Sequence, residues 1–399
     1  MPAEVSPGDA SGMRRLRERW FSLAAIDASV LIIGVTFLRN AWSEAAALRW
    51  SLLASLLLIY QLAFVWRRLP RNIRRLDGQL LPVFGLGNGL TLFRGVLLAA
   101  LGGFLMLPLP QGGWAWIPAI LYTCTDVGDY FDGLLARLRH EETYLGEDLD
   151  IEFDALGLLL AVCLGVAYGK LPIWYLGIGV TRYAFLAGQW LLRRSGKLVL
   201  ALPPSQTRRP IAGLTMGFAS AMLWPIVRPP ATTLAGWIFA VPLLLSFGRD
   251  WLVVSGVLQA GEARYLRWRW RAKRLAFTWL PLLPRAGIVV CGAAFLLADG
   301  SIAWAGLSMN WGTGSVHAAF RLIEIVCGVF IAFGCAGRLA AFVLLFPLGL
   351  TIAGLGPTPL SLAWLSAALL VLLLGTGAAS LWQPETKTSG LRPGTSPAA

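Results

Sequence analysis

Apolar stretches long enough to cross a bilayer, which takes about 17–25 residues, recur along nearly the whole chain. They lie near 21–38, 47–66, 88–107, 113–137, 149–168, 172–193, 211–228, 231–256, 285–300, 316–334, 337–354 and 358–378. Short segments that are polar or rich in glycine and proline separate them. The pattern predicts an all-α fold, a polytopic transmembrane helical bundle of about twelve spans in blocks of two, six and four.

Basic residues gather in short runs between the apolar stretches. The runs are 14–19, 67–75, 137–139, 193–197 with 208–209, and 264–274. Placing both termini in the cytoplasm puts every run on the cytoplasmic face, as the positive-inside rule requires. We therefore expect a multi-pass protein of the cell inner (plasma) membrane.

Composition supports the same class. Of 399 residues, 57% are hydrophobic and only 14% charged, too few polar residues for the surface of a soluble protein of this length. The net charge of +13 is spread over loops beside apolar segments, which favours membrane lipids and not nucleic acid as the partner. No cleaved signal peptide is expected. The five cysteines lie in apolar stretches without a CxxC motif, so we expect neither disulfides nor zinc.

Changes in composition divide the chain into five segments. We predict an N-terminal two-helix segment with a basic juxtamembrane element (1–87), a six-helix core (88–258), a basic and aromatic interfacial linker (259–283), a four-helix block (284–380) and a disordered tail (381–399). Alternating arginine and tryptophan at 264–271 places the linker in the headgroup layer.

Four carboxylates break the apolar pattern of the core. Asp129 and Asp132 are three residues apart, Asp150 and Asp154 four apart, so each pair shares one helix face. A short reversal between the two helices lets the pairs converge. Carboxylates at membrane depth are costly and typical of functional sites. Converging carboxylates need a cation between them, and oxygen ligands favour Mg²⁺ or Mn²⁺.

Small and basic neighbours complete the pattern. Gly133, Ala136 and Gly146 leave room for a bulky ligand near the backbone, and Arg137 supplies a fixed cation for phosphates. The alternative is that the four acids only pair with nearby arginines. The other acids of this region, Glu147, Asp148 and Glu152, are expected to face the cytoplasm or a basic loop.

The string Asp-x2-Asp-Gly-x2-Ala-Arg-x8-Gly-x3-Asp-x3-Asp, from Asp129 to Asp154, resembles the signature of the CDP-alcohol phosphatidyltransferase family at every fixed position. Upstream, 88–94 (Asn-Gly-Leu-Thr-Leu-Phe-Arg) resembles the Asn-x-Leu-Thr-x-x-Arg that opens the family's first core helix. The resemblance covers 88–258.

The resemblance implies the following roles. Asp129, Asp132, Asp150 and Asp154 would bind a pair of metal ions, and Asp154 would also be the catalytic base. Thr91, Gly133, Ala136, Arg137 and Gly146 would bind CDP. The partners would be a lipid CDP-alcohol donor and an alcohol acceptor, in phospholipid biosynthesis, with CMP released. A second copy of the chain, in a homodimer, is a further candidate partner.

Three arginines are candidates for binding an acceptor phosphate. Arg182 lies inside a predicted span, where a charge is costly, and Arg208 and Arg209 lie at the mouth of the next span. For Arg208 and Arg209, anchoring by the positive-inside rule is an equal alternative.

The last four spans resemble the DoxX family, through 321–328, 337–341 and 372–377. Arg321 and Glu324 are three residues apart in an apolar helix, which predicts an internal ion pair. Two other hypotheses stay open for the whole chain: a cation-coupled transporter that uses the same carboxylates, and an inactive core that supports the four-helix block.

Overall fold

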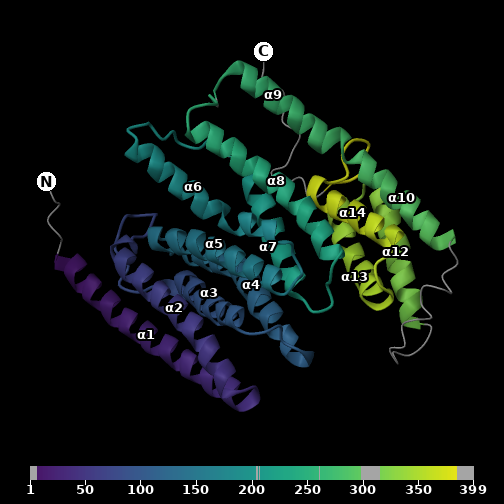
Figure 1. Ribbon diagram of the computed structural model, residues 1–399. Coiled ribbons are helices and arrows are strands. Elements are labelled where there is room, and N and C mark those ends of the chain that lie inside the picture. Colours follow the sequence, from purple (N-terminus) through teal and green to yellow (C-terminus); the bar gives the residue numbers. More distant parts are fainter. Residues whose placement is uncertain (1–6, 204, 206, 260, 298–314, 384–399) are drawn as a thin grey trace. The chain divides into compact units, whose positions relative to one another are not determined.

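The computed structural model describes residues 7–203, 205, 207–259, 261–297 and 315–383 (Figure 1). Over these residues the chain is helical and contains no β-strand, only three isolated bridges. The predicted all-α class is therefore confirmed. The predicted tail at 381–399 lies largely outside the described residues.

The helices, with the numbering of Figure 1, are α1 (Pro7–Ala41), α2 (Glu44–Arg68), α3 (Gly85–Gly103), α4 (Trp116–Arg139), α5 (Tyr144–Ala167), α6 (Leu176–Arg194), α7 (Arg208–Leu223), α8 (Ala231–Val254), α9 (Ala263–Arg274), α10 (Leu282–Leu297), α12 (Ser315–Phe333), α13 (Gly337–Leu355) and α14 (Pro359–Leu374). Shorter turns are η1 (Leu69–Arg71), η2 (Phe104–Met106), η3 (Gly112–Ala115), η4 (Ile173–Tyr175) and the π-helical η5 (Leu275–Trp279). Each predicted span overlaps one of these helices.

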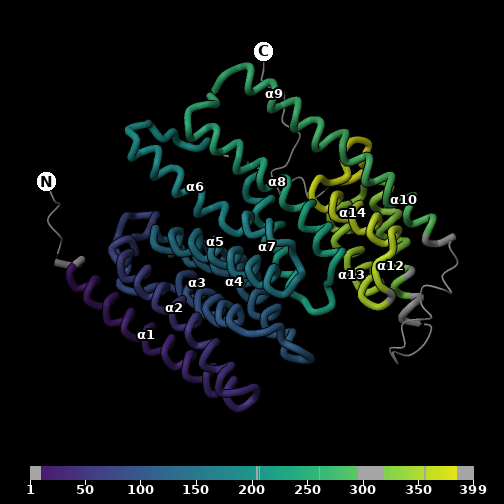
Figure 2. Tube along the Cα trace, in the orientation of Figure 1, coloured from purple at the N-terminus to yellow at the C-terminus, as the bar shows by residue number. Residues whose placement is uncertain are grey.

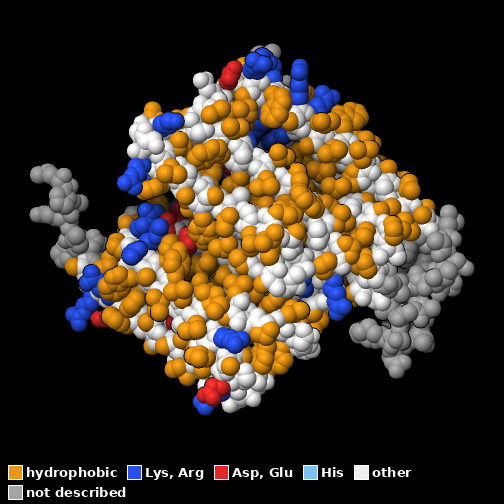
Figure 3. All heavy atoms as spheres, viewed as in Figure 1, with side chains coloured by type: hydrophobic (Ala, Val, Ile, Leu, Met, Phe, Trp, Pro, Cys, Tyr) orange, Lys and Arg blue, Asp and Glu red, His pale blue; other side chains and the backbone are white. Residues whose placement is uncertain are grey.

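Among the described residues, six helical segments are long and apolar enough to cross a membrane. They are Ala10–Ala41, Glu44–Arg71, Gly85–Met106, Ala231–Val254, Ala263–Ala294 and Gly337–Gly354. Large apolar side chains point outward from them, as at Ile32 and Ile33, which are 65% and 66% exposed. Hydrophobic side chains cover most of the face seen in Figure 3. These features indicate a membrane-embedded protein, while the total of twelve spans stays a prediction.

One compact unit comprises Met1–Arg182 together with Ala219–Pro225. In it α1 packs on α2, and α3 packs on α2, α4 and α5. The Trp50 indole of α2 fits between two glycines, since a Cβ at Gly34 or Gly103 would lie 2.5 Å or 2.4 Å from its ring. These close contacts fix the position of α3, the central helix of the unit.

The segment between α2 and α3 is a strap, which we define as residues 68–84. It folds back on itself through a bridge between Ile73 and Leu80 and a hydrogen bond from the Arg74 amide to the Gln79 carbonyl (2.8 Å). It also contacts the loop between α4 and α5, because the Arg75 amide donates to the Glu142 carbonyl (2.8 Å). The sequence predicts only a basic juxtamembrane element at this place.

The second unit comprises Tyr183–Phe218 and Ile226–Ala399. Its helical path runs from α9 through η5 into α10 without a reversal, as the trace in Figure 2 shows. Helices α10, α12, α13 and α14 pack on one another in the predicted four-helix block. Glu324 is buried on α12, but the side chain of Arg321 lies outside the described residues, so their predicted ion pair stays a prediction.

Candidate functional site

The two acidic helices meet at a short, well-defined loop. Helix α4 ends at Arg139 because His140 takes the left-handed conformation (φ 52°). Helix α5 begins after Thr143, whose hydroxyl caps it by accepting from the Gly146 amide (3.0 Å). The chain therefore reverses directly, which brings the last turns of α4 beside the first turns of α5.

All four predicted carboxylates come together, and the cation between them is Arg94 of α3. The nitrogen–oxygen distances from its guanidinium are 2.7 Å to Asp129, 2.6 Å to Asp132, 3.3 Å to Asp150 and 2.8 Å to Asp154. We call Asp129, Asp132, Asp150 and Asp154 the carboxylate cluster. Its convergence matches the sequence prediction, but the central guanidinium was not assigned any role there.

The carboxylate cluster is closed at one end and open at the other. The Arg94 side chain is 1% exposed and that of Asp132 is 6% exposed. The other three carboxylates are 32% (Asp129), 33% (Asp154) and 47% (Asp150) exposed. A ligand can therefore reach these three from the open side, while Arg94 and Asp132 form the buried base.

Small and hydroxyl side chains shape this buried base. The Thr91 hydroxyl donates to Asp132 Oδ2 (2.9 Å), which holds that carboxylate toward Arg94. A Cβ at Gly128 would lie 3.1 Å from Cγ of Arg94, so the glycine leaves room for the arginine stem. The predicted CDP-binding residue Thr91 thus also orients an acid of the carboxylate cluster.

The carboxylate cluster has the composition of a divalent cation site. Oxygens of Asp129, Asp132 and Asp150 lie within 4.8 Å of one another. Carboxylates this close together repel one another unless a proton or a cation lies between them. Arg94 neutralises one of the four negative charges. Hard oxygen ligands with excess negative charge fit Mg²⁺ or Mn²⁺.

The predicted CDP-binding residues of α4 lie within the turn and a half that follows Asp132. A Cβ on Gly133 would lie 3.2 Å from Nη1 of Arg137, so the exposed arginine folds back over the glycine. Ala136 packs on Gly87 of α3, where a Cβ would lie 2.8 Å from the alanine Cβ. The small residues therefore permit close packing of α3 on α4, and their part in CDP binding stays a prediction.

Gly146 has a packing role that the sequence did not indicate. A Cβ there would lie 2.3 Å from Oδ1 of Asn88. The Asn88 amide donates to the Thr143 hydroxyl (3.0 Å), which caps α5. The absence of a side chain at Gly146 thus allows α3 to reach the start of α5.

The three acceptor-phosphate candidates belong to two different units, Arg182 to the first and Arg208 and Arg209 to the second. Arg182 is half-buried on α6 and Arg209 is exposed at the start of α7. Arg208 donates to Oδ2 of the buried Asp250 (2.8 Å), and Arg249 lies 3.2 Å from the other oxygen of that acid. Burial of Asp250 between two arginines is a contact that the sequence analysis missed.

The sequence analysis did not predict the ion pairs that Arg94 and Arg249 form with aspartates. The signal for Arg94 was present, because it is a lone charge within an apolar span, one helical turn after Thr91. The signal for Arg249 was its adjacency to Asp250 in an otherwise apolar helix. Both pairs need the tertiary structure to be recognised.

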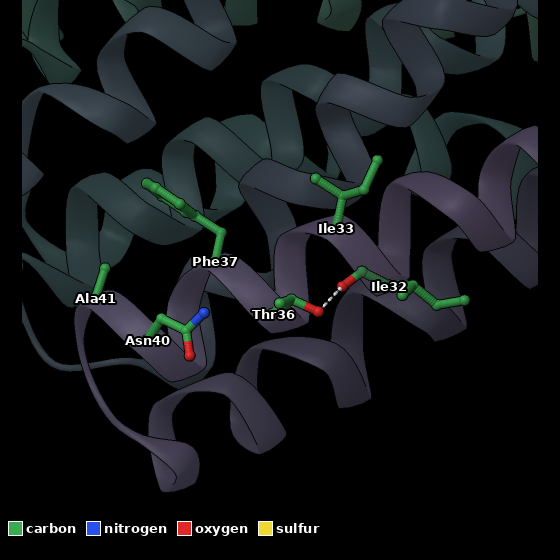
Figure 4. Close-up of a pocket in the computed structure, with 6 residues that line it drawn as sticks. All are labelled: Ile32, Ile33, Thr36, Phe37, Asn40 and Ala41. Carbon is green, nitrogen blue, oxygen red and sulfur yellow. Dashed lines mark hydrogen bonds between the residues drawn. The ribbon is translucent and has the colours of Figure 1, made fainter.

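A separate groove of about 440 Å³ runs along α1 (Figure 4). Ile32, Ile33, Thr36, Phe37, Asn40 and Ala41 line it. The Thr36 hydroxyl is bonded to the carbonyl of Ile32 (2.8 Å) and no charged residue takes part. The lining residues include no acid, histidine or cysteine, so the groove offers no metal site.

Comparison with protein families gives a match that fits this geometry. Residues 84–257 match the family model for CDP-alcohol phosphatidyltransferase. The match covers a little under half of the chain and falls where the sequence signature predicts it. Comparisons with curated proteins and with solved structures found no match. The matched residues include Arg94 and the whole carboxylate cluster, and exclude most of the strap.

Proposed function

We propose that the protein transfers a phosphatidyl or similar phospho-alcohol group from a CDP-alcohol to an acceptor alcohol and releases CMP. The observation that carries the proposal is the carboxylate cluster, which converges on Arg94 inside the segment that matches the transferase family. The reaction would serve phospholipid biosynthesis, with a lipid CDP-alcohol as donor.

The buried residues and the exposed acids of the site would have different roles. Arg94 and Thr91 hold the carboxylates in place from below, and Asp129, Asp132, Asp150 and Asp154 would hold two Mg²⁺ or Mn²⁺ ions. Such ions, when bound, neutralise the charge of a diphosphate during phosphoryl transfer. Gly133, Ala136, Arg137 and Gly146 would bind the CDP moiety near the end of α4 and the start of α5.

Asp154 would act as the general base. Arg94 contacts its Oδ1 at 2.8 Å, which orients the carboxylate, and we assign Oδ2 to receive the proton of the acceptor hydroxyl. The deprotonated hydroxyl attacks the β-phosphorus, a new oxygen–phosphorus bond forms, and the bond to the leaving CMP breaks. A carboxylate one-third exposed can meet a substrate that enters from the open side.

We place this reaction on the cytoplasmic side of the inner membrane. The basic strap hydrogen-bonds to the loop between α4 and α5, so two of the basic runs lie at the same end of the first unit. The carboxylate cluster is built from the helix turns next to that loop. Basic residues mark cytoplasmic ends under the positive-inside rule, which supports a cytoplasmic site.

The proposal is tested with the full chain purified into lipid nanodiscs. Labelled CDP-diacylglycerol is supplied with Mg²⁺ or Mn²⁺ and with glycerol phosphate, inositol phosphate or unphosphorylated alcohols in turn, and CMP and lipid products are measured. Metal-dependent CMP release with one class of acceptor supports the proposal and identifies that class. Absence of both CMP release and CDP-alcohol binding would contradict it.

The phosphate of a phosphorylated acceptor would bind Arg182, Arg208 or Arg209. Of these, Arg208 is already paired with the buried Asp250, which Arg249 also contacts. A cation-coupled transporter remains the rival function. Uptake of a labelled divalent ion into proteoliposomes, with no CMP release, would favour that rival.

A further inference from the structure

The first three turns of α5 carry acids on two opposite faces. Asp150 and Asp154 face Arg94. Asp148 and Glu152 each precede one of them by two residues, which is about 200° of helical rotation, and so point the other way. The contacts on this opposite face come from the strap and from α2.

Asp148 is the most firmly held of these outward acids. Its Oδ2 lies 2.7 Å from Arg68 Nη1 and 2.6 Å from Arg71 Nε, and its side chain is only 15% exposed. Arg71 Nη2 also donates to Asp148 Oδ1 (3.3 Å). A bidentate arginine fixes a carboxylate in direction as well as in position.

Two further contacts hold α5. On the face of Asp148 and one turn further along, the Tyr60 hydroxyl donates to Glu152 Oε1 (2.6 Å). At the start of α5, Arg75 Nη2 lies 3.4 Å from Glu147 Oε2. The strap and α2 thus contact α5 at three acids, two of which lie on its outward face.

A second line of hydrogen bonds reaches the cap of α5. Asn72, which is fully buried, donates from Nδ2 to the carbonyls of Leu81 (2.9 Å) and Val83 (2.8 Å). Its Oδ1 accepts from Asn88 Nδ2 (3.1 Å), and Asn88 in turn donates to the capping hydroxyl of Thr143. The strap therefore fixes both the start of α5 and its outward face.

We propose that the strap is a positioning element for the carboxylate cluster, with Arg68, Arg71 and Asn72 as its positioning residues. Holding Asp148 and the cap sets the rotation of α5 about its own axis. That rotation decides whether Asp150 and Asp154 reach the cation site, since a shift of one residue would turn both by about 100°. The inference rests on the proposed function for its catalytic consequence, while its effect on metal binding does not.

The test uses the full chain in nanodiscs with the variants Asp148→Ala and Arg68→Ala/Arg71→Ala. Partners that orient metal ligands typically change metal affinity about 10- to 100-fold. We expect Mn²⁺ affinity, followed by the electron paramagnetic resonance of the free ion, to fall about tenfold or more. The kcat for CMP release should fall with it, because misplaced ligands lose the reactive geometry.

Arg74→Ala is the matched control. Arg74 is a strap arginine of similar exposure, but its ion pair is with Asp77 inside the strap (3.1 Å) and not with α5. We expect this variant to keep wild-type Mn²⁺ affinity and turnover. The milder Arg71→Lys, which keeps the charge and loses the two-pronged contact, should weaken Mn²⁺ binding by an intermediate factor and gives a result if the alanine variants do not fold.

Two outcomes separate this inference from the proposed function. If Asp148→Ala and the double variant are folded and keep Mn²⁺ affinity within twofold of wild type, the strap does not position the carboxylate cluster. If the variants lose Mn²⁺ affinity while wild-type protein releases no CMP from any CDP-alcohol, the inference holds and the transferase proposal fails.

Discussion

Arg94 and Asp132 form the most buried ion pair of the carboxylate cluster, with a nitrogen–oxygen distance of 2.6 Å and side chains 1% and 6% exposed. Thr91 donates to the same oxygen of Asp132, so Oδ2 of this carboxylate accepts two hydrogen bonds. The other three acids reach the same guanidinium from more exposed positions. Arg94 therefore holds α3, α4 and α5 together at the place where chemistry is proposed.

Arg94→Ala should destabilise the protein strongly in the absence of divalent metal. Removing one partner of a buried ion pair costs about 3–5 kcal/mol, because the remaining charges are left uncompensated. Saturating Mg²⁺ should restore part of the loss by replacing the missing cation. Thermal unfolding with chelator and with Mg²⁺ measures both effects, and an unchanged Tm in chelator would show that Arg94 does not hold the carboxylate cluster.

Asp154→Asn should abolish turnover and leave CDP-alcohol binding largely intact. The amide cannot accept the acceptor proton, and loss of a general base reduces kcat by about 100- to 10,000-fold. Single-turnover CMP release and a binding titration separate the two effects. Glu18→Gln, which changes an exposed acid paired with Arg14 on α1, is the control. Loss of CDP-alcohol binding instead would make Asp154 chiefly a metal ligand.

Arg182→Ala should raise the KM for a phosphorylated acceptor. A hydrogen bond to a charged group contributes about 1.5–3 kcal/mol, so the increase should be about tenfold or more. The KM for the CDP-alcohol should stay the same. Arg209→Ala is the comparison, because for that exposed arginine anchoring by the positive-inside rule is an equal alternative. An unchanged acceptor KM would return Arg182 to a structural role.

Gly146→Ala should destabilise the junction of α3 and α5. The new Cβ would lie 2.3 Å from Asn88 Oδ1, and overpacking of this kind costs about 1–3 kcal/mol. Gly89→Ala, on α3 and with no atom within 4 Å of the new Cβ, should change the Tm little or raise it. Equal Tm values for the two variants would contradict the packing role of Gly146.

Much of the fold is encoded in local patterns that the sequence displays directly. Apolar runs predict the helices, and the i, i+3 and i, i+4 spacing of acids predicts the shared faces of Asp129 with Asp132 and of Asp150 with Asp154. These features depend on helical periodicity alone. They could therefore be predicted without knowing which helices are neighbours.

The features that were missed depend on contacts between distant segments. The strap joins Asn72 to Asn88 and to Thr143, residues that are 16 and 71 positions further along the chain, respectively. Asp148 contacts Arg68 and Arg71 of the basic run 67–75, which agrees with the expectation that it faces the cytoplasm or a basic loop, but the sequence did not identify these two partners. Nothing in the local pattern distinguishes these arginines from others that only mark the cytoplasmic side.

The location of the strap determines how much of the N-terminal part of the chain a functional fragment would need. The family match starts at residue 84, but residues that contact the outward face of α5 or the hydrogen bonds at its cap lie before it, at Tyr60, Arg68, Arg71 and Asn72. A fragment trimmed to the family boundary would leave Asp148 exposed and Asn88 short of an acceptor. If the strap and α2 position α5 as we propose, the shortest active fragment should include α2. This helix would then contribute to the structure of the site as well as to anchoring in the membrane.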